Sequence, residues 1–406
     1  MSWVHWTRKS QDASVTRGPL GVDLNAGRAR AAHGRAARNK LFLLDDPRTD
    51  LALGISLEKR MAEVGPAAAA VSRKLPHVIC TGYLPSLGLA QEWKSGRHSL
   101  TADAATALAL DRLRAACQSH DGVGFALPTY LSLPQVGKLV ALAEKAKLMV
   151  RGTATVPLAL AAERATHYLH GQHEEASEPP RSGRSFNPTT VLIVDADEHA
   201  LTASVVRISE EEVRSLGSAT FPRLGVRIWR ERLLDSLADR CVRLCRRDPR
   251  DSADAEQMLF DQVDEAVDRA RTGQRASLSV RATHWFQDLV VTPVDLDAFC
   301  MPLWRAAAKE LRQLLASLNE PEPPRAAWLT HDAGRLPGLA SALHQNMTER
   351  TNVRVLHPEA AAAAAANLID RWAAGNLPRT HLDTTIPLPP RVDARVAAPR
   401  SPLARR

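Results

Sequence analysis

The sequence predicts an α/β fold made of two similarly built halves. Apolar strands alternate with amphipathic helices between residues 101 and 168, an order typical of a parallel sheet covered by helices. In each half the first strand ends in an aspartate, Asp23 in LGVD and Asp195 in VLIVD. The length of 406 residues also favours two packed units, since single cores stop growing near ~250–300 residues.

Composition limits the classes of function. Hydrophobic residues make up 45% of the chain and charged residues 24%, close to the average for soluble globular proteins. The net charge of +8 is spread along the chain and aromatic residues are only 4%, so dedicated nucleic-acid binding is not expected. No apolar run approaches the ~20 residues of a spanning helix, which argues against membrane insertion. Five scattered cysteines predict a reducing, cytoplasmic location.

The first predicted half covers residues 19–185 and follows an N-terminal extension of residues 1–18. Thr101 can cap a helix through Ala116, because its hydroxyl can accept from the first-turn amides. The apolar patterns predict strands at 20–24, 76–82, 122–128 and 149–150, and helices at 56–64, 133–148 and 157–168. Residues 171–190 are polar and rich in Pro, Gly and Ser, so we expect a surface connection there.

The second predicted half covers residues 186–376. Its patterns predict strands at 191–195, 201–208, 277–280, 285–291 and 326–330, and helices at 226–247, 253–272, 295–318 and 358–374. The last helix contains seven consecutive alanines, a composition that favours helix. Residues 377–406 are basic and rich in Pro and Arg, and we expect a disordered or peripheral tail.

Several sequence blocks, taken in order, resemble the actin-like ATPase superfamily, and in particular the nucleotide-binding domain of the DnaK-type, seventy-kilodalton heat-shock chaperones. The blocks between about residues 20 and 375 are the two strand–aspartate turns, GVGFALPTYLSLPQVGKLVALAEKAKL, VRGTATVPLALAAE, FPRLGVRIWRERLLDSLA, VTPVDLDAFCMPLWRAAAKELRQLLA, AAWLTHDAGRLPGLASAL and HPEAAAAAAA. The resemblance implies a two-lobed, ribonuclease H-like fold in which each lobe is a mixed sheet flanked by helices. It covers no client-binding domain.

The same resemblance implies a nucleotide site between the lobes, with ATP or ADP and Mg²⁺ as cofactors. Asp23 and Asp195 stand at the positions that organise magnesium and would be the catalytic residues and metal ligands. The implied nucleotide-contacting residues are Asp23, Asn25, Gly27, Asp195, Asp197, Gly225, Gly334 and Arg335.

The loops around these residues depart from the family pattern. Two hydroxyls aimed at the γ-phosphate are missing after Asp23, where the sequence reads LNAG. Three glycines after Asp195 are replaced in ADEHA, which adds two acids that would repel phosphate. Val156 stands for the glutamate near the attacking water, Val226 for a glycine, and HD at 331–332 for the Gly-Gly pair. Since the missing groups stabilise transition-state charge, the sequence predicts a pseudo-ATPase that acts as a scaffold for an unknown protein partner, with weak or absent ATP binding.

Two other functions stay open on the sequence. One is an active chaperone-like ATPase or sugar-kinase-like phosphotransferase with rearranged groups, in which Asp23 or Asp195 remains catalytic. The other is an actin-like filament or cell-division partner. Three further groups could bind a metal but match no standard motif: the histidines 167, 170 and 173 with Glu174 and Glu175, the pair Cys241 and Cys245, and the acids Asp195, Asp197 and Glu198.

Overall fold

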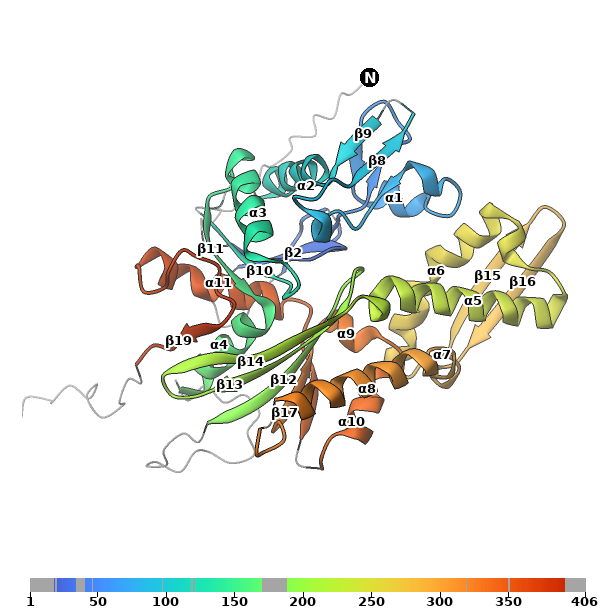
Figure 1. Ribbon diagram of the computed structural model, residues 1–406. Coiled ribbons are helices and arrows are strands. Elements are labelled where there is room, and N and C mark those ends of the chain that lie inside the picture. Colours follow the sequence, from blue (N-terminus) through green and yellow to red (C-terminus); the bar gives the residue numbers. More distant parts are fainter. Residues whose placement is uncertain are drawn as a thin grey trace, which may run out of the picture.

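The computed structural model describes residue 18 and residues 20–390, apart from positions 34–40, 46, 97, 118–119, 121, 170–187, 319 and 350. Over these residues the chain forms helices packed on mixed sheets, which confirms the predicted α/β class (Figure 1). None of the helices within the described ranges is long and apolar enough to cross a membrane. The N-terminal extension falls almost entirely outside these ranges.

The first large sheet carries the turn that follows Asp23. Its strands run in the order β11-β10-β1-β2-β3, and β4 also pairs with β2. The β1–β10 and β10–β11 pairs are parallel, whereas β1–β2 and β2–β3 are antiparallel. The strands are β1 (Leu20–Leu24), β2 (Arg28–His33), β3 (Leu41–Phe42), β4 (Asp50–Ala52), β10 (Val123–Leu127) and β11 (Val150–Thr155).

The second large sheet repeats this arrangement. Its order is β18-β17-β12-β13-β14-β19, with β12–β17 and β17–β18 parallel and β12–β13 and β13–β14 antiparallel. Asp23 and Asp195 therefore lie on the corresponding central strand of each sheet. The strands are β12 (Thr189–Ala196), β13 (Leu201–Ile208), β14 (Glu212–Phe221), β17 (Ala326–Leu329), β18 (Asn352–Val355) and β19 (Thr385–Pro387).

Two helices join the sheets to each other. α4 (Val156–Leu169) follows the last strand of the first sheet, yet it packs against β13 and β14 of the second. α11 (Ala360–Ala373) follows the second sheet and packs against β1, β2 and β10 of the first. The two helices also contact each other, and a buried core of residues from both halves surrounds them. The halves therefore share one continuous interface.

The alanine run is explained by how closely α11 approaches the first sheet. Three strands present a glycine to the helix: Gly21 on β1, Gly124 on β10 and Gly152 on β11. A Cβ at position 21 would lie 1.9 Å from the carbonyl oxygen of Ala362, so only glycine fits there. Small residues on both surfaces thus permit backbone-to-backbone packing. The predicted helix 358–374 is confirmed within two residues at each end.

The remaining elements cover the two sheets and extend the fold at one end of the molecule. In the first half they are α1 (Pro66–Ala70), α2 (Ala102–Ala116), α3 (Leu133–Lys145) and the short strands β5 (Ile55–Ser56), β6 (Glu63–Val64), β7 (Ile79–Cys80), β8 (Glu92–Ser95) and β9 (His98–Thr101). In the second half they are α5 (Val226–Cys245), α6 (Ala253–Arg271), α7 (Pro293–Phe299), α8 (Met301–Ser317), α9 (His331–Arg335), α10 (Leu339–Asn346), β15 (Ala276–Ala282) and β16 (Trp285–Val291). The α5, α6, β15 and β16 group forms the right-hand end of the molecule in Figure 1.

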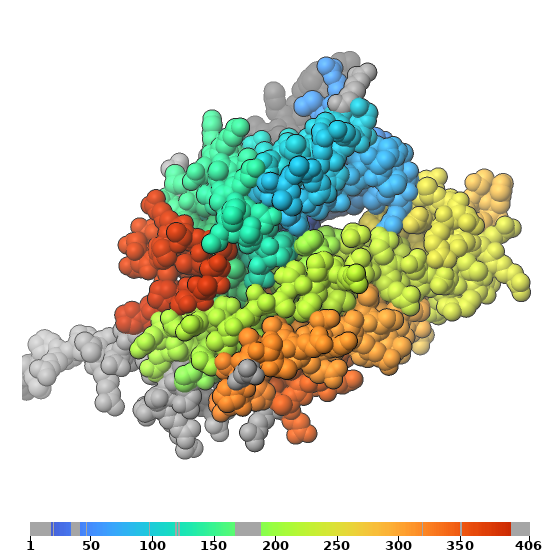
Figure 2. Space-filling view, viewed as in Figure 1, coloured from blue at the N-terminus to red at the C-terminus, as the bar shows by residue number. Residues whose placement is uncertain are grey.

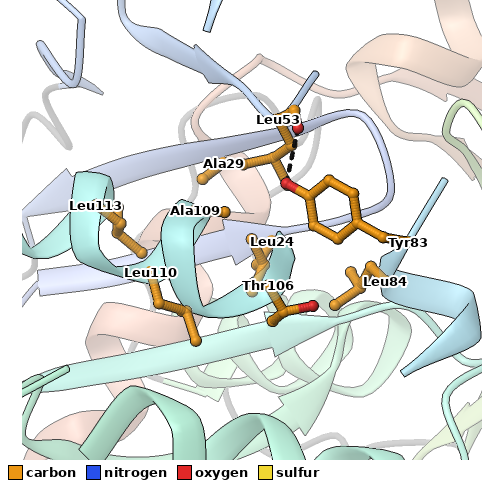
Figure 3. A pocket seen from close by; sticks show the side chains of 9 residues that line it. All are labelled: Leu24, Ala29, Leu53, Tyr83, Leu84, Thr106, Ala109, Leu110 and Leu113. Atoms are coloured by element: carbon orange, nitrogen blue, oxygen red, sulfur yellow. Dashed lines mark hydrogen bonds between the residues drawn. The ribbon is translucent and has the colours of Figure 1, made fainter. Parts of the chain in front are cut away.

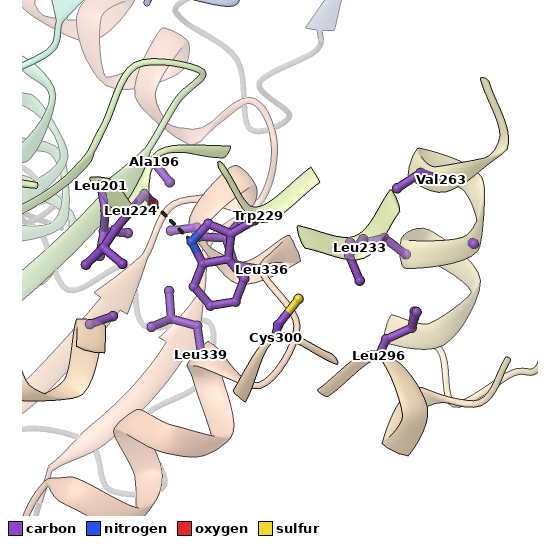
Figure 4. Close-up of a cluster of buried hydrophobic side chains, with 14 of the residues drawn as sticks. Ala196, Leu201, Leu224, Trp229, Leu233, Val263, Leu296, Cys300, Leu336 and Leu339 are labelled. Atoms are coloured by element: carbon purple, nitrogen blue, oxygen red, sulfur yellow. Dashed lines mark hydrogen bonds between the residues drawn. The ribbon is translucent and has the colours of Figure 1, made fainter. Parts of the chain in front are cut away.

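Each half has its own apolar core. In the first, the Tyr83 ring lies against Leu24 and Leu84, and its hydroxyl donates to the carbonyl oxygen of Leu53 at 2.7 Å (Figure 3). In the second, the buried Trp229 side chain lies among leucines and Cys300, and its Nε1 donates to the carbonyl oxygen of Leu224 at 3.0 Å (Figure 4). In both, the one polar atom of a large ring is satisfied by backbone, as burial requires.

Three sequence-based predictions of local structure are wrong. Residues 56–64 were expected to be helical but form β5, a bend and β6, with Ile55 and Leu57 both buried at the two-residue spacing of a strand. The helix expected at 295–318 is two helices that meet at Cys300, because Pro302 has no amide proton to donate. The strand expected at 76–82 is a 3₁₀ turn followed by β7.

The tail prediction is also wrong for residues 377–390, which belong to the fold. β19 pairs with β14 at the edge of the second sheet. The amide of Leu382 donates to Thr153 at 3.0 Å, and its carbonyl accepts from Thr155 at 2.9 Å, which ties the same segment to β11 of the first sheet. Leu382 and Ile386 are buried, so apolar side chains fix a segment whose prolines suggested disorder. Residues 391–406 lie outside the described residues.

Candidate functional site

A cleft separates the two halves, and the strand–aspartate turns border it from either side. The space-filling view shows the hollow between the blue residues of the first half and the green and yellow residues of the second (Figure 2). Asp23 lies one residue before the end of β1, and Asp195 lies one residue before the end of β12. The charge of Asp23 acts on Asp195, whose Oδ1 accepts from Thr330, the residue before the short helix α9. The turns that follow the two aspartates meet at this cleft, where the amide of Ala26 donates to Asp197.

Arg28 occupies the centre of this cleft. Its Nη1 donates to Asp23 Oδ2 at 2.9 Å, and across the cleft its Nη2 and Nε contact Asp332 Oδ2 at 2.6 and 2.8 Å. Asp50 Oδ2 lies 3.7 Å from Nε. The neighbouring carboxylates hold the pKa of Arg28 well above its usual value despite the cost of burial, and Arg28 holds the pKa of Asp332 well below its own. A fixed cation of the protein thus bridges carboxylates of both halves.

Asp195 lies near three carboxylates of the cleft, those of Asp23, Asp197 and Asp332. Its Oδ1 accepts from Thr330 Oγ1 at 2.7 Å and from the amide of Ala196 at 2.9 Å. Burial raises the pKa of Asp195 to about 7, and the charges of Asp23, Asp197 and Asp332 add to this against the Thr330 hydrogen bond. Near neutral pH the protonated and the ionised form of this side chain are therefore both populated.

Asp197 joins the turns that follow Asp23 and Asp195 directly. Its Oδ2 accepts from the amide of Ala26 at 3.0 Å and from Tyr130 Oη at 2.5 Å, both in the first half. Its Oδ1 accepts from the amides of His199 and Ala200 at 2.9 Å, which closes its own turn. The carboxylate is buried. It accepts from backbone amides of both turns and from the hydroxyl of Tyr130, which follows β10.

The turn after Asp23 is closed by its own side chain. Asn25 Oδ1 accepts from the amides of Gly27 and Arg28, each at 3.0 Å. Gly27 lies against Glu198, since a Cβ at position 27 would be 2.6 Å from Glu198 Cγ. Glu198 in turn pairs with Arg230 of α5 at 2.9 Å. The amides of this turn are therefore bonded to side chains of the protein itself.

The remaining predicted site residues serve packing or line the cleft wall. Gly225 begins α5, and a Cβ there would lie 2.6 Å from the His199 carbonyl carbon. A Cβ on Gly334 would meet Val355 at 2.3 Å. Arg335 pairs with Asp268 at 2.7 Å and lines the cavity beside the network. The structure therefore brings Asp23, Asn25, Gly27, Asp195 and Asp197 together, whereas the two later glycines are explained by close packing.

A second set of contacts joins the outer parts of the halves. Arg73, after α1, pairs with Glu231 of α5 and lies 4.8 Å above the Phe260 ring of α6. Gln257 of α6 accepts from the Arg73 amide at 2.8 Å and donates to the Ala69 carbonyl at 2.9 Å. These contacts between the segment around α1 and the helices α5 and α6 join the halves in addition to the Arg28 network.

The site residues do not fit Mg²⁺ with ATP. The guanidinium of Arg28 already neutralises Asp23, and the buried Asp197 carboxylate takes the amide of Ala26 that would face a phosphate. A phosphate next to Asp197 and Glu198 would also meet like charge. No group of three or more His, Cys, Asp or Glu side chains within the described ranges has the geometry to hold a metal ion.

The other candidate metal groups gain no support. Cys241 and Cys245 lie on one face of α5 with their sulfurs 3.6 Å apart, and burial raises the pKa of Cys241 to about 12. His170, His173, Glu174 and Glu175 lie outside the described residues, as does the side chain of His167. The acids Asp195, Asp197 and Glu198 are engaged by Thr330, by backbone amides and by Arg230.

Sequence reasoning missed the residues that connect the network. Arg28 and Tyr130 were not singled out, and Asp332 was considered only as a replacement for glycine. One signal was present: the segment RARAAH, directly after the first turn, places two arginines two residues apart on one face of a strand. Arg30 is buried there and pairs with Asp50. No protein-family model matches the chain, and no curated protein matches it either.

Proposed function

We propose that this chain is a degenerate, two-lobed actin-like protein, related to the DnaK-type chaperone nucleotide-binding domain, that acts as a protein-interaction scaffold and does not hydrolyse ATP. The repeated strand order of the two sheets and the two helices that pack across between them support the fold assignment. The five cysteines, all free, support a cytoplasmic location as part of the same proposal.

One observation carries the functional proposal: the chain's own side chains engage the groups that would hold a metal ion and a phosphate. Arg28 lies between Asp23 and Asp332, where a catalytic centre of this kind would need a metal ion. Asp197 accepts the hydrogen bonds of Ala26 and Tyr130, where such a centre would bind phosphate. These bonds join the two halves through groups of the chain itself. A permanently closed scaffold presents one constant surface to a partner.

Calorimetric titration with ATP and Mg²⁺, together with single-turnover hydrolysis, tests the proposal. We expect no binding at micromolar concentrations and no turnover. Micromolar binding with turnover that Asp195→Asn abolishes would refute it and favour an active chaperone-like ATPase or sugar-kinase-like phosphotransferase. The Asp111→Asn variant, on the exposed face of α2, serves as the matched control.

Co-purification from the native host tests the scaffold role. We expect a protein partner whose recovery is the same with and without ATP and Mg²⁺, because the bonds that close the cleft involve no nucleotide. Recovery that depends on ATP would contradict this. Sedimentation of the pure protein addresses the filament alternative: polymers that pellet would favour an actin-type role over a scaffold.

A further inference from the structure

The cleft contains a cavity beside the Arg28 network that the network does not fill. Its volume is about 160 Å³. One wall is apolar and comes from α5 and α6, with Trp229, Leu233, Val263 and Val267. An engineered apolar cavity of about 150 Å³ is large enough to hold benzene. The space next to these four side chains therefore has room for one aromatic or aliphatic ring.

The polar side of the cavity is acidic. Five carboxylates line it, from Asp50, Asp197, Glu198, Asp264 and Asp332, against the guanidiniums of Arg28, Arg230 and Arg335. Each guanidinium already has a partner. Arg28 pairs with Asp23 and Asp332, Arg230 pairs with Glu198, and Arg335 pairs with Asp268. The lining thus has a formal excess of two negative charges. Burial first, and then the charges of Asp23, Asp197 and Asp332, raise the pKa of Asp195 nearby.

Asp264 is the carboxylate with room for a new partner. Its side chain is 59% exposed, and the nearest cationic nitrogens, on Arg230 and Arg335, lie 3.7 and 3.8 Å from Oδ1. Both distances exceed that of a hydrogen bond. It projects from α6, which also supplies Val263 and Val267 to the apolar wall. A ring against that wall would bring a short substituent near Asp264.

We propose that this cavity binds a small organic cation: a single ring that lies on the α5–α6 wall and carries an ammonium or amidinium group that pairs with Asp264. The assignment rests on the proposed function, because a cleft that bound ATP could not have this charge preference. An anionic ligand would face the excess carboxylates, whereas a cation reduces their repulsion.

Three probes of one shape test the charge preference: phenethylamine, phenethyl alcohol and phenylacetate, titrated at pH 7.5 and followed by calorimetry and ligand-observed NMR. We expect the amine to bind at least about fivefold more tightly than the alcohol, as one partly exposed ion pair allows, and the acid to bind weakest. Equal affinities, a preference for the acid, or no binding of any probe would overturn the proposal.

Two variants locate the site. Asp264→Asn should remove the preference of the amine over the alcohol, while Asp111→Asn on α2 leaves it unchanged. Val263→Phe, which fills the cavity, should abolish binding of all three probes in a protein whose circular dichroism is unaltered. Retained amine preference in Asp264→Asn would overturn the proposal. Micromolar ATP binding would overturn the proposed function itself, whereas absence of both ATP and amine binding would overturn only this inference.

Discussion

The pH dependence of the free energy of unfolding should reveal that Asp195 takes up a proton in the folded state. Its pKa in the folded protein is about 7, against 3.8 as the ordinary value. Between these two values the folded state holds a proton that the unfolded state has lost. The stabilisation from this group is therefore complete below about pH 4 and is lost as the pH rises through 7.

The magnitude follows from the distance between the two pKa values. About three pH units, at about 1.4 kcal/mol each, give a loss of about 4 kcal/mol in the free energy of unfolding between pH 4 and 8. Asp195→Asn keeps the oxygen that accepts from Thr330 but cannot ionise. We therefore expect the variant to lack this slope, and to be more stable than the natural protein above pH 7.

Urea unfolding from pH 5 to pH 8, followed by circular dichroism, measures the difference between the two proteins. Subtracting one curve from the other cancels the histidines and other carboxylates that both proteins share. Asp111→Asn, on the exposed side of α2, should run parallel to the natural protein. A difference curve for Asp195→Asn that stays flat across this range would refute the account of Asp195.

Three further substitutions test the contacts between the halves by urea unfolding. Arg28→Ala leaves the carboxylates of Asp23 and Asp332 without their cation and should cost about 3 kcal/mol; a loss below about 1 kcal/mol would mean that solvent replaces the bridge. Gly21→Ala places a methyl group against the α11 backbone and should lower the free energy of unfolding by about 3 kcal/mol. Its control is Gly137→Ala on α3, where a Cβ would have nothing within 4 Å, and this variant should be more stable by about 0.5–1 kcal/mol. If the two variants changed the stability by similar amounts, the packing explanation would be contradicted. Ile386→Ala in β19 should lower the free energy of unfolding by about 3 kcal/mol, and Val290→Ala at an exposed position should lower it far less. Equal losses for the two variants would show that the C-terminal segment does not stabilise the fold.

The sequence predicted the regular elements well where side chains repeat with a clear period. The strand at 201–208 and the strand at 285–291 are confirmed to the residue, and the cap at Thr101 accepts from the Ala104 amide at 3.2 Å. Errors arose where a short segment decides its structure through distant partners. The segment 56–64 is too short to show a helical period, and its strands pair with each other and with β7.

The sequence indicated the two aspartates that border the candidate site, but not Arg28, which lies between Asp23 and Asp332. Aspartates after apolar strands are visible in the sequence, because the strands are local. The ion pairs of Arg28 are not, since Asp332 is 304 positions away and its proximity depends on the packing of both sheets. The same holds for the Asp197 bond to Ala26, which spans 171 positions. Sequence reasoning identified the acids as a repulsive surplus, whereas the fold supplies them with donors.

The two arginines of β2, Arg28 and Arg30, have different partners in the cleft. Arg30 binds Asp50 and the carbonyl of Pro358, next to α11, so it holds the base of the cleft. Arg28 projects further along the same strand face and binds Asp23 and Asp332 at its centre. Opening the halves would separate Arg28 from Asp332 and Asp197 from Ala26 at once, so two charge-assisted hydrogen bonds between the halves would be lost. A phosphate that entered the cleft would have to displace Asp332 from Arg28 or Asp197 from the amide of Ala26, and the displaced carboxylate would then face a like charge. The closed arrangement is therefore favoured by the chain's own charges, as a constant binding surface needs.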